Sequence, residues 1–449
     1  MSRLVATTER EVNEGLRPET AVRPLRWAWQ RWHLWLLLIG LLLRVGFCLA
    51  TDREASFAGW DGKEYYAYAQ SLLALRGDDY PRYFNAIRPP LYPIFLTPFV
   101  AASDHVVWPI QLTQALLGLL QAFLLAKIAG RWAGQRAGNW AFGIALLHPF
   151  LIYFPAFILT ETLFITLLWA GLACLQKWDG PQMETRARWL YLSALALGLG
   201  CLTRPALQPF LVVAVVWIGW RTFARGGWPS ALKRMTQFTI IVSALLLPWM
   251  IANYRRHGDI TLAPRTAQAM YALANSPDYL RMYEAHTKAE YYRTFEQLVA
   301  RYSVESGTSP EQWAEEARDF RQHQRAAWWR LQWYKFRHFW TPWLNPLIFP
   351  RTQFLLSVLS ATPLFLLAAA ELFRRRRTLK RDPFLLLMLG LIGVGYLVAG
   401  FLFHVQVRYR IPFVDLTCII LTASLLGQLT LRKVAAWKLV KLLRPAEAL

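Results

Sequence analysis

The chain has 449 residues, of which 55% are hydrophobic and 22 are tryptophan, and its formal net charge is +22. This composition excludes an ordinary soluble globular protein, because apolar runs of about 20 residues alternate with basic clusters, the pattern of membrane-spanning helices. The positive charge does not indicate nucleic-acid binding, since the lysines and arginines gather at the ends of the apolar runs, where lipid headgroups lie.

Ten apolar ranges predict an all-α integral membrane protein with about ten transmembrane helices. The ranges are 33–50, 108–129, 138–155, 157–176, 189–204, 206–222, 237–252, 353–373, 383–403 and 412–430. The polar N-terminal segment lacks the apolar core and cleavage site of a signal peptide, so we expect a cytoplasmic tail. The four cysteines lie inside apolar runs without paired spacing, which argues against a disulfide framework or zinc site.

The charges between these ranges predict the orientation. Short basic segments are typical of cytoplasmic loops, and "RRRRTLKRD" alone would resist translocation. They lie at 130–137, 177–188, 221–236, 374–382 and after 431. The expected divisions are a tail at 1–32, helices one to seven within 33–252 with a first outer loop at 51–107, an outer loop domain at 253–350, the last three helices within 351–431, and a tail at 432–449. We therefore expect a bacterial inner-membrane protein whose functional face points to the periplasm.

The two long outer segments contain amphipathic sequences. Residues 64–75 place Tyr65, Ala69 and Leu72 on one stripe, which predicts a helix lying along the membrane surface. Residues 311–340 predict one long helix or two, and the mixture of aromatic and basic residues in the second half suits the headgroup layer.

The stretch "GWDGKEYYAYA" follows the first apolar range and brings Asp61, Lys63 and Glu64 together at the outer face. Asp61 is either a helix N-cap or a functional carboxylate. A cap would not explain why Arg88 and other basic residues accumulate on this outer loop, against the usual charge bias. We therefore expect an anionic ligand to bind at this outer loop.

Four further motifs lie at outer ends of helices. They are "RPPLYP" with Arg88 and Tyr92, "ILTETLF" with Glu161, "LTRPAL" with Arg204, and the pair "PWMIANYRRHGD" and "HVQVRYRIP" with Arg255, Arg256, Arg408 and Arg410. Each has an ordinary structural explanation: a rigid loop, a carboxylate favoured by a helix dipole, or an interfacial anchor. Because all five motifs converge on one face, they predict a cavity with a carboxylate and a phosphate-binding wall.

The order and placement of these motifs from about Leu34 to Leu429 resemble the membrane C-type (GT-C) glycosyltransferases, in particular the family 39-like branch of protein O-mannosyltransferases and aminoarabinose transferases. The resemblance implies a GT-C fold and a polyprenyl-phosphate sugar donor, with inverting transfer on the outer face to a glycan, glycolipid or protein. It further implies that Asp61 is the first-loop catalytic acid, that Glu161 is the second acid, and that Arg204, Arg255 and Arg408 lie near the lipid phosphate.

Two departures from the family pattern stand out. The first-loop acid is often followed by a second acid, whereas here Gly62 follows Asp61. Ala252 precedes "NY" where arginine is common, which leaves open whether Arg255 or Arg256 contacts phosphate. The cofactor is unknown; Asp61, Glu64 and Glu161 would offer oxygen ligands to Mg²⁺ or Mn²⁺.

Two other functions stay open. A lipid-linked sugar transporter or flippase would also need arginines and a cavity, but it predicts charges midway within helices and repeat symmetry. Arg44 is the single candidate for such a charge, and no internal repeat is evident in the sequence. A non-catalytic envelope-assembly protein would not need the carboxylates. The expected partners are the lipid-linked donor, its acceptor and membrane lipids, and no nucleic acid.

Overall fold

The computed structural model describes residues 30–57, 60–74, 88–102, 107–180, 186–258, 260, 262, 264–302 and 309–443. These residues form helices joined by short connections, and none of them is in a strand. This confirms the all-α membrane fold. Residues 1–29 of the predicted N-terminal tail and 444–449 of the predicted C-terminal tail lie outside the described residues, whereas 432–443 continue the last helix.

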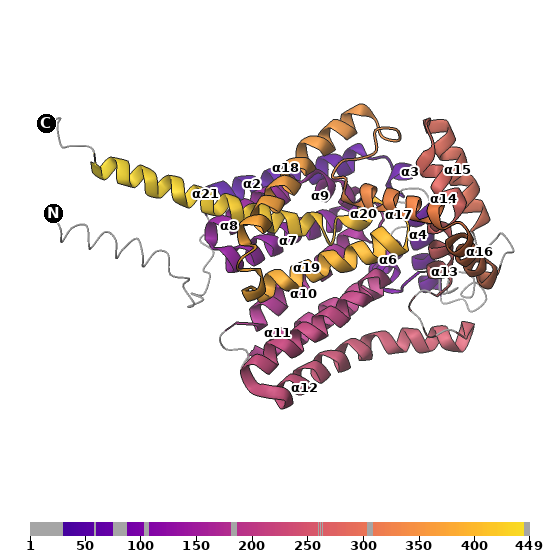
Figure 1. The fold of residues 1–449 in the computed structure, drawn as a ribbon, viewed down its shortest axis with the longest axis horizontal. Helices are drawn as coiled ribbons and strands as arrows, with labels where there is room; N and C mark the ends of the chain where they lie inside the picture. Colours follow the sequence, from indigo (N-terminus) through magenta and orange to yellow (C-terminus); the bar gives the residue numbers. More distant parts are fainter. Residues whose placement is uncertain are drawn as a thin grey trace.

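Long apolar helices form a bundle, with shorter helices gathered at one of its ends (Figure 1). The bundle contains α2 (Arg31–Ala50), α7 (Trp108–Ala133), α8 (Gln135–Leu147), α10 (Glu161–Trp178), α11 (Ala187–Thr203), α12 (Gln208–His257), α18 (Arg351–Arg375), α19 (Pro383–Gly395) with the π-helical η6 (Tyr396–Leu402), and α21 (Asp415–Leu443). Short connecting elements are α3 (Arg53–Ser56), α9 (Pro149–Tyr153), η1 (Phe154–Ala156), η3 (Pro205–Leu207), η5 (Leu379–Arg381) and α20 (Val407–Arg410).

Each of the ten predicted apolar ranges is largely helical, but fewer helices have the length and hydropathy of a membrane span. Among the described residues five qualify, or six when the bent pair formed by 135–147 and 149–156 is taken as one. The difference has a physical reason. Several helices are shorter than the predicted ranges or include charged residues at their ends. Helix α10 begins at Glu161 rather than at 157, and α11 and the apolar part of α21 are too short to qualify.

The predicted helices 206–222 and 237–252 are the two arms of α12. Gly226 and Gly227 interrupt the helical backbone between them, and the chain turns back along itself there (Figure 1). Gly227 has a φ of 69°, in the left-handed region that side chains with a Cβ disfavour. The glycine pair therefore makes the hairpin between the two arms.

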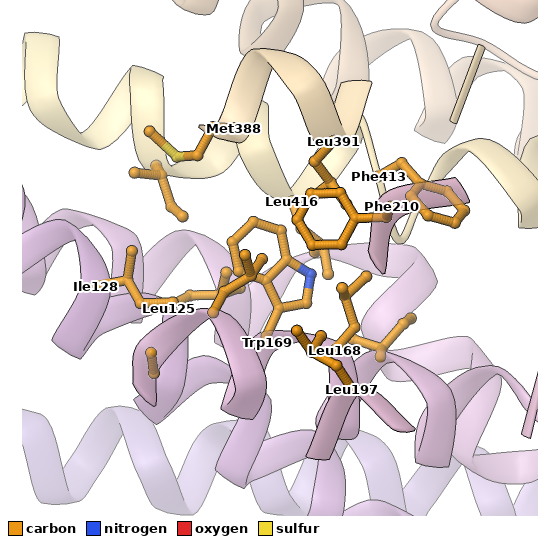
Figure 2. Close-up of a cluster of buried hydrophobic side chains, with 14 of the residues drawn as sticks. Leu125, Ile128, Leu168, Trp169, Leu197, Phe210, Met388, Leu391, Phe413 and Leu416 are labelled. Atoms are coloured by element: carbon orange, nitrogen blue, oxygen red, sulfur yellow. The ribbon is translucent and has the colours of Figure 1, made fainter. Parts of the chain in front are cut away.

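The core of the bundle fixes the helices that carry the candidate site. Trp169 of α10 is fully buried among leucines, Phe210 and Met388 (Figure 2). Its indole N–H donates to the carbonyl of Pro412 at 3.1 Å, which satisfies the polar atom that the ring carries into the core. This bond ties α10 to the chain just after α20.

The shorter helices form a second cluster at one end of the bundle. They are α4 (Trp60–Ala74), α6 (Leu91–Ala102), α13 (Pro264–Ala274), α14 (Pro277–Glu284), α15 (Lys288–Arg301), α16 (Pro310–His323) and α17 (Arg325–Trp340). Side chains of Ser276, Thr287 and Ser309 cap the starts of α14, α15 and α16. The predicted helix at 311–340 is thus two helices, and α17 leaves Trp329 and Trp333 more than half exposed.

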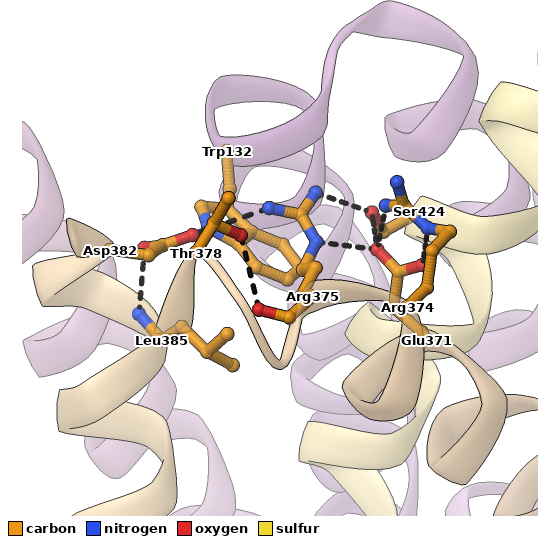
Figure 3. Close-up of polar contacts among 8 residues, drawn as sticks. All are labelled: Trp132, Glu371, Arg374, Arg375, Thr378, Asp382, Leu385 and Ser424. Atoms are coloured by element: carbon orange, nitrogen blue, oxygen red, sulfur yellow. Dashed lines mark hydrogen bonds and ion pairs between the residues drawn. The ribbon is translucent and has the colours of Figure 1, made fainter. Parts of the chain in front are cut away.

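At the opposite end of the bundle, a polar network joins α7, α18, α19 and α21 (Figure 3). Glu371 accepts from Arg374, Arg375 and Ser424, and Asp382 accepts from Trp132 while capping the start of α19. We call these residues the far-end network.

Candidate functional site

Asp61 lies in the first turn of α4, and two arginines from distant parts of the chain hold it. Nη2 of Arg88 is 2.6 Å from one carboxylate oxygen, and Nη2 of Arg408 is 2.8 Å from the other. Arg88 lies three residues before the start of α6, whereas Arg408 belongs to α20 in the last tenth of the chain. The structure therefore brings three of the predicted motifs together around one carboxylate.

The backbone packing at position 62 explains why a glycine follows Asp61. The Gly62 N–H donates to the carbonyl of Phe57 at 3.0 Å. A Cβ at position 62 would lie 2.1 Å from that oxygen, closer than any side chain tolerates. The acid that often follows the first-loop acid directly in the family cannot occupy position 62 without moving the turn. Glu64, which accepts from Arg88 Nε at 2.8 Å, supplies the additional negative charge instead.

Glu161 forms a second ion pair beside the first. It begins α10, where a carboxylate is favoured by the helix dipole, and its side chain is 1% exposed. Arg204, which follows α11, approaches it to 3.0 Å, and Nε of Arg408 lies 3.9 Å from the same oxygen. Arg408 thus bridges the two carboxylates predicted to be catalytic. We call Asp61, Glu64, Arg88, Glu161, Arg204 and Arg408 the arginine–carboxylate cluster.

Aromatic rings line the cluster. The Arg88 guanidinium lies over Tyr65, and Arg204 and Arg408 each lie 4.9 Å from the ring centre of Tyr409. Such cation–π contacts hold a guanidinium in place without using its N–H groups. Tyr92 packs edge-on against Tyr65 and donates to Gln114 at 3.0 Å, so it supports the wall rather than facing outward.

The electrostatics of the cluster favour the charged forms. Burial by itself would raise the pKa of the Asp61 carboxyl, but Arg408 and Arg88 outweigh burial and hold this pKa well below its usual range. Burial would also lower the pKa of Arg408, yet Tyr409, Glu161 and Asp61 raise it. Asp61 is therefore an ionised carboxylate at neutral pH and a weak base while both arginines hold it.

The guanidinium groups retain unused donors. Arg88 and Arg408 spend only Nε and Nη2, and Arg204 spends only Nη2, on hydrogen bonds or ion pairs within the described chain. A guanidinium offers five N–H donors and binds phosphate in a forked geometry. The cluster can thus receive an additional anion.

Two neighbouring residues were missed from the sequence. His404 opens the motif that contains Arg408, and burial together with Arg408 lowers the pKa of its ring to about 3, so it is neutral. Lys335 of α17 is buried and donates to the carbonyls of Ala274 and Phe401, and burial lowers its pKa to about 7. A histidine beside paired arginines could have been noticed in the sequence, whereas nothing in the sequence separates Lys335 from other basic residues of 311–340.

Four predicted binding residues are not brought into the cluster. Lys63 is exposed and pairs with Glu54 at 3.2 Å. Arg410 is buried and engaged by Asp415 at 2.8 Å and by backbone carbonyls, which makes it an internal structural pair. Arg255 is exposed at the end of α12 and has no ion pair within the described chain, and the side chain of Arg256 lies outside the described residues.

Arg44 does not mark a pathway through the bundle. Its guanidinium donates to the carbonyls of Gly40, Leu146 and Ala145 at 2.8, 2.9 and 3.3 Å. The last two carbonyls belong to the end of α8, where the helix bends and leaves acceptors unpaired. Arg44 thus supplies hydrogen-bond donors to carbonyls that the bend leaves without helical partners.

The predicted oxygen ligands do not assemble into a metal site. Within the described part of the chain, no three histidine, cysteine or carboxylate side chains lie close enough to share an ion. Asp61, Glu64 and Glu161 each face an arginine instead. This donor set, with guanidinium groups between the carboxylates, does not fit a bound divalent cation.

Comparison with known proteins supports the resemblance drawn from the sequence. Residues 89–262 match the family model described as dolichyl-phosphate-mannose-protein mannosyltransferase, which confirms that resemblance over this part of the chain. A comparison with curated proteins gave no match.

Two solved structures of an archaeal oligosaccharyltransferase share the fold. The archaeal oligosaccharyltransferase AglB from Archaeoglobus fulgidus, in complex with an inhibitory peptide and a dolichol-phosphate, matches 93% of this chain at 12% identity with a TM-score of 0.53. The same protein in the apo form matches 92% at 11% identity and a TM-score of 0.52. ArnT from Cupriavidus metallidurans, bound to undecaprenyl phosphate, matches 94% of this chain and 82% of its own at 15% identity, with a TM-score of 0.45. The chain spans about half the length of the archaeal protein, 52% in both structures.

Proposed function

We propose that this protein is a membrane glycosyltransferase that moves a sugar from a polyprenyl-phosphate donor to a hydroxyl acceptor. The observation that carries the proposal is the position of Asp61 between Arg88 and Arg408, at 2.6 and 2.8 Å. A carboxylate held by two guanidinium groups is a stand-in for the anion that those groups would bind in a substrate complex. The family match over 89–262 and the shared fold of AglB, whose structure contains dolichol-phosphate, support the same donor class.

Donor binding would change the basicity of Asp61. A phosphate that draws Arg88 and Arg408 toward itself weakens the two contacts that hold the carboxyl pKa down. The pKa of Asp61 then rises toward the range of a useful base only when the donor is in place. Catalysis and donor binding would be coupled through these two arginines.

The reaction step follows from this arrangement. The acceptor hydroxyl attacks the anomeric carbon on the face opposite the phosphate, and the carbon–oxygen bond to phosphate breaks with its electron pair on the leaving oxygen. Asp61 accepts the hydroxyl proton, and the arginines stabilise the released polyprenyl phosphate. The anomeric configuration is inverted. No step is assigned to a metal ion.

Glu161 is assigned a positioning role. It pairs with Arg204 and reaches Arg408 at 3.9 Å, so it sets the angle from which Arg408 approaches both Asp61 and the phosphate. Its side chain is buried, which leaves little room for direct contact with an acceptor.

We place the reaction on the periplasmic side of a bacterial inner membrane. The basic segments predicted to be cytoplasmic include the one that starts with Arg374 and Arg375 at the end of α18 and runs to α19, at the end of the bundle opposite α4 and α20 (Figure 1). Positively charged loops remain on the cytoplasmic side.

The test uses the purified full-length protein in nanodiscs, a radiolabelled polyprenyl-phosphate sugar and an envelope glycan extract as acceptor. We expect wild type to transfer label and Asp61→Asn to lose transfer by a factor of about 10³ while still binding donor. Asp52→Asn, which alters only the cap of α3, is the matched control. Equal transfer by wild type and Asp61→Asn would remove Asp61 from the mechanism. With the protein reconstituted in liposomes, movement of labelled lipid across the bilayer without transfer would favour a flippase.

A further inference from the structure

A pocket of about 160 Å³ lies outside the arginine–carboxylate cluster, between α14, α15, α17 and the chain that follows α17. Its lining includes Tyr283, Tyr291, Tyr334, Arg337, His338 and Asn345. Nothing in the proposed transfer step uses these residues. The volume suits one ring-sized ligand rather than a peptide or a lipid chain.

One wall of the pocket is built from flat rings. Tyr283 stacks on His338, with ring centres 4.7 Å apart, and lies nearly parallel to Tyr334 at 6.0 Å and 9°. Aromatic side chains combine an apolar face with a polar edge, so they suit ligands that have both kinds of surface. A pyranose ring has such surfaces, with C–H groups on its faces and hydroxyls around its edge.

Polar groups around this wall are unused. Within the described part of the chain, the side-chain donors of Asn345, the rings of His338 and the hydroxyls of Tyr291 and Tyr334 make no hydrogen bond. Binding sites that orient small polar ligands place a few such groups around an apolar surface. The arrangement offers both donors and acceptors to ring hydroxyls.

Arg337 gives the pocket a positive charge. Its guanidinium forms no ion pair among the described residues. The neighbouring His338 adds no charge, because burial together with Arg337 lowers the pKa of its ring to about 4. No carboxylate belongs to the lining. The charge therefore favours a ligand with an anionic group.

The pocket is joined to the proposed reaction site through two hydrogen bonds. The hydroxyls of Tyr283 and Tyr279 are 3.3 Å apart, and the Val405 N–H donates to Tyr279 at 3.1 Å. Val405 lies next to His404 and three residues before Arg408. A ligand held against Tyr283 would thus lie behind the segment that carries a cluster arginine.

We propose that this pocket binds a saccharide unit of the acceptor that carries a carboxylate or a phosphate group. The proposal rests on the glycosyltransferase function, for which the pocket would supply acceptor recognition.

The binding test uses the full-length protein in nanodiscs and saturation-transfer NMR with glucuronic acid, glucose 6-phosphate and glucose. We expect the two acidic sugars to bind in the range of about 1 mM and glucose at least tenfold more weakly. Arg337→Gln should abolish the preference for acidic sugars, and Tyr334→Ala should weaken all three. Arg325→Gln, at an exposed arginine of the same helix outside the pocket, is the control and should change nothing. The tighter of the two acidic sugars identifies the anionic group.

Two outcomes separate this proposal from the proposed function. Binding of acidic sugars that depends on Arg337, in a protein without transferase activity, would retain the pocket and reject the transferase. Transfer in which Arg337→Gln and Tyr334→Ala leave the acceptor KM unchanged would reject the pocket as an acceptor site. Equal binding of glucose and glucuronic acid by wild type would also overturn it.

Discussion

The arginine–carboxylate cluster and the far-end network are made from the same residue types and sit at opposite ends of one bundle, yet they differ in completeness. In the far-end network, the central pair is closed: Glu371 is 0% exposed, and Arg375 donates from all three guanidinium nitrogens to Glu371, Asp382 and Ser424, whereas Arg374 at the rim is 38% exposed (Figure 3). In the arginine–carboxylate cluster, Asp61, Arg88 and Arg408 are each about a quarter exposed, and the two arginines retain unused donors. A network whose partners are all internal stabilises the fold, whereas one with spare donors and access to a ligand can do chemistry.

The strongest test of this comparison is to remove Arg408, the residue of the arginine–carboxylate cluster that contacts both carboxylates. Arg408→Gln removes the cation shared by Asp61 and Glu161, and we expect transfer to fall by about 10²–10³-fold because the leaving phosphate loses a stabilising charge. The melting temperature should change little, since Arg408 is partly exposed. Transfer rate and thermal melting in nanodiscs measure the two effects. A large loss of stability with normal transfer would reverse the distinction between the two networks.

The reciprocal change is Arg375→Gln in the far-end network. It leaves Asp382 without its arginine and Glu371 with one fewer partner, so we expect a loss of about 3 kcal/mol in the free energy of unfolding. Arg376→Gln is the matched control, because the neighbouring arginine donates to the carbonyl of Phe373, lies over the ring of the same residue and contacts no member of the network. Denaturant titration measures stability, and transfer per folded molecule should remain at the wild-type level. Lower transfer without lower stability would contradict the structural role.

These two networks also show what a sequence can predict. The apolar ranges predicted the bundle, because burial and membrane crossing depend on local hydropathy, and the motifs predicted Asp61, Arg88, Glu161, Arg204 and Arg408 as one site. The family resemblance named Arg408 as the phosphate-side arginine, but the residues by themselves did not separate it from Arg410 two positions away, since only the fold decides which one meets Asp415. It also missed Lys335, whose burial depends on packing against Ala274 and Phe401, residues far from it along the chain.

Lys335 sharpens the comparison further, because it is a buried cation with no carboxylate partner in the described chain. Its pKa is lowered from 10.5 to about 7, so between these values the unfolded chain binds the proton and the folded protein does not. Wild type should therefore lose stability as the pH falls from 10.5 toward 7, and little more below 7. Between pH 9 and pH 7 the loss should be about 2 kcal/mol.

The measurement is thermal melting across this pH range for wild type, Lys335→Met and the exposed control Lys288→Met. Lys335→Met should flatten the alkaline slope, and Lys288→Met should keep it. An unchanged slope in Lys335→Met would mean that another group titrates in this range.

The smallest effect is expected at Lys63, two residues from Asp61 and predicted from the sequence to bind substrate. In the structure it pairs with Glu54, which is not part of the arginine–carboxylate cluster, and 61% and 76% of the two side chains are exposed. Exposed pairs of this kind contribute about 0–1 kcal/mol, so Lys63→Ala should change stability by at most about 0.5 kcal/mol. Transfer should stay within about twofold of wild type, because no bond to Asp61, Arg88 or Arg408 is lost. A larger fall in transfer, with donor KM raised, would show that donor binding turns Lys63 toward the cluster and would extend the phosphate-binding wall beyond the three arginines.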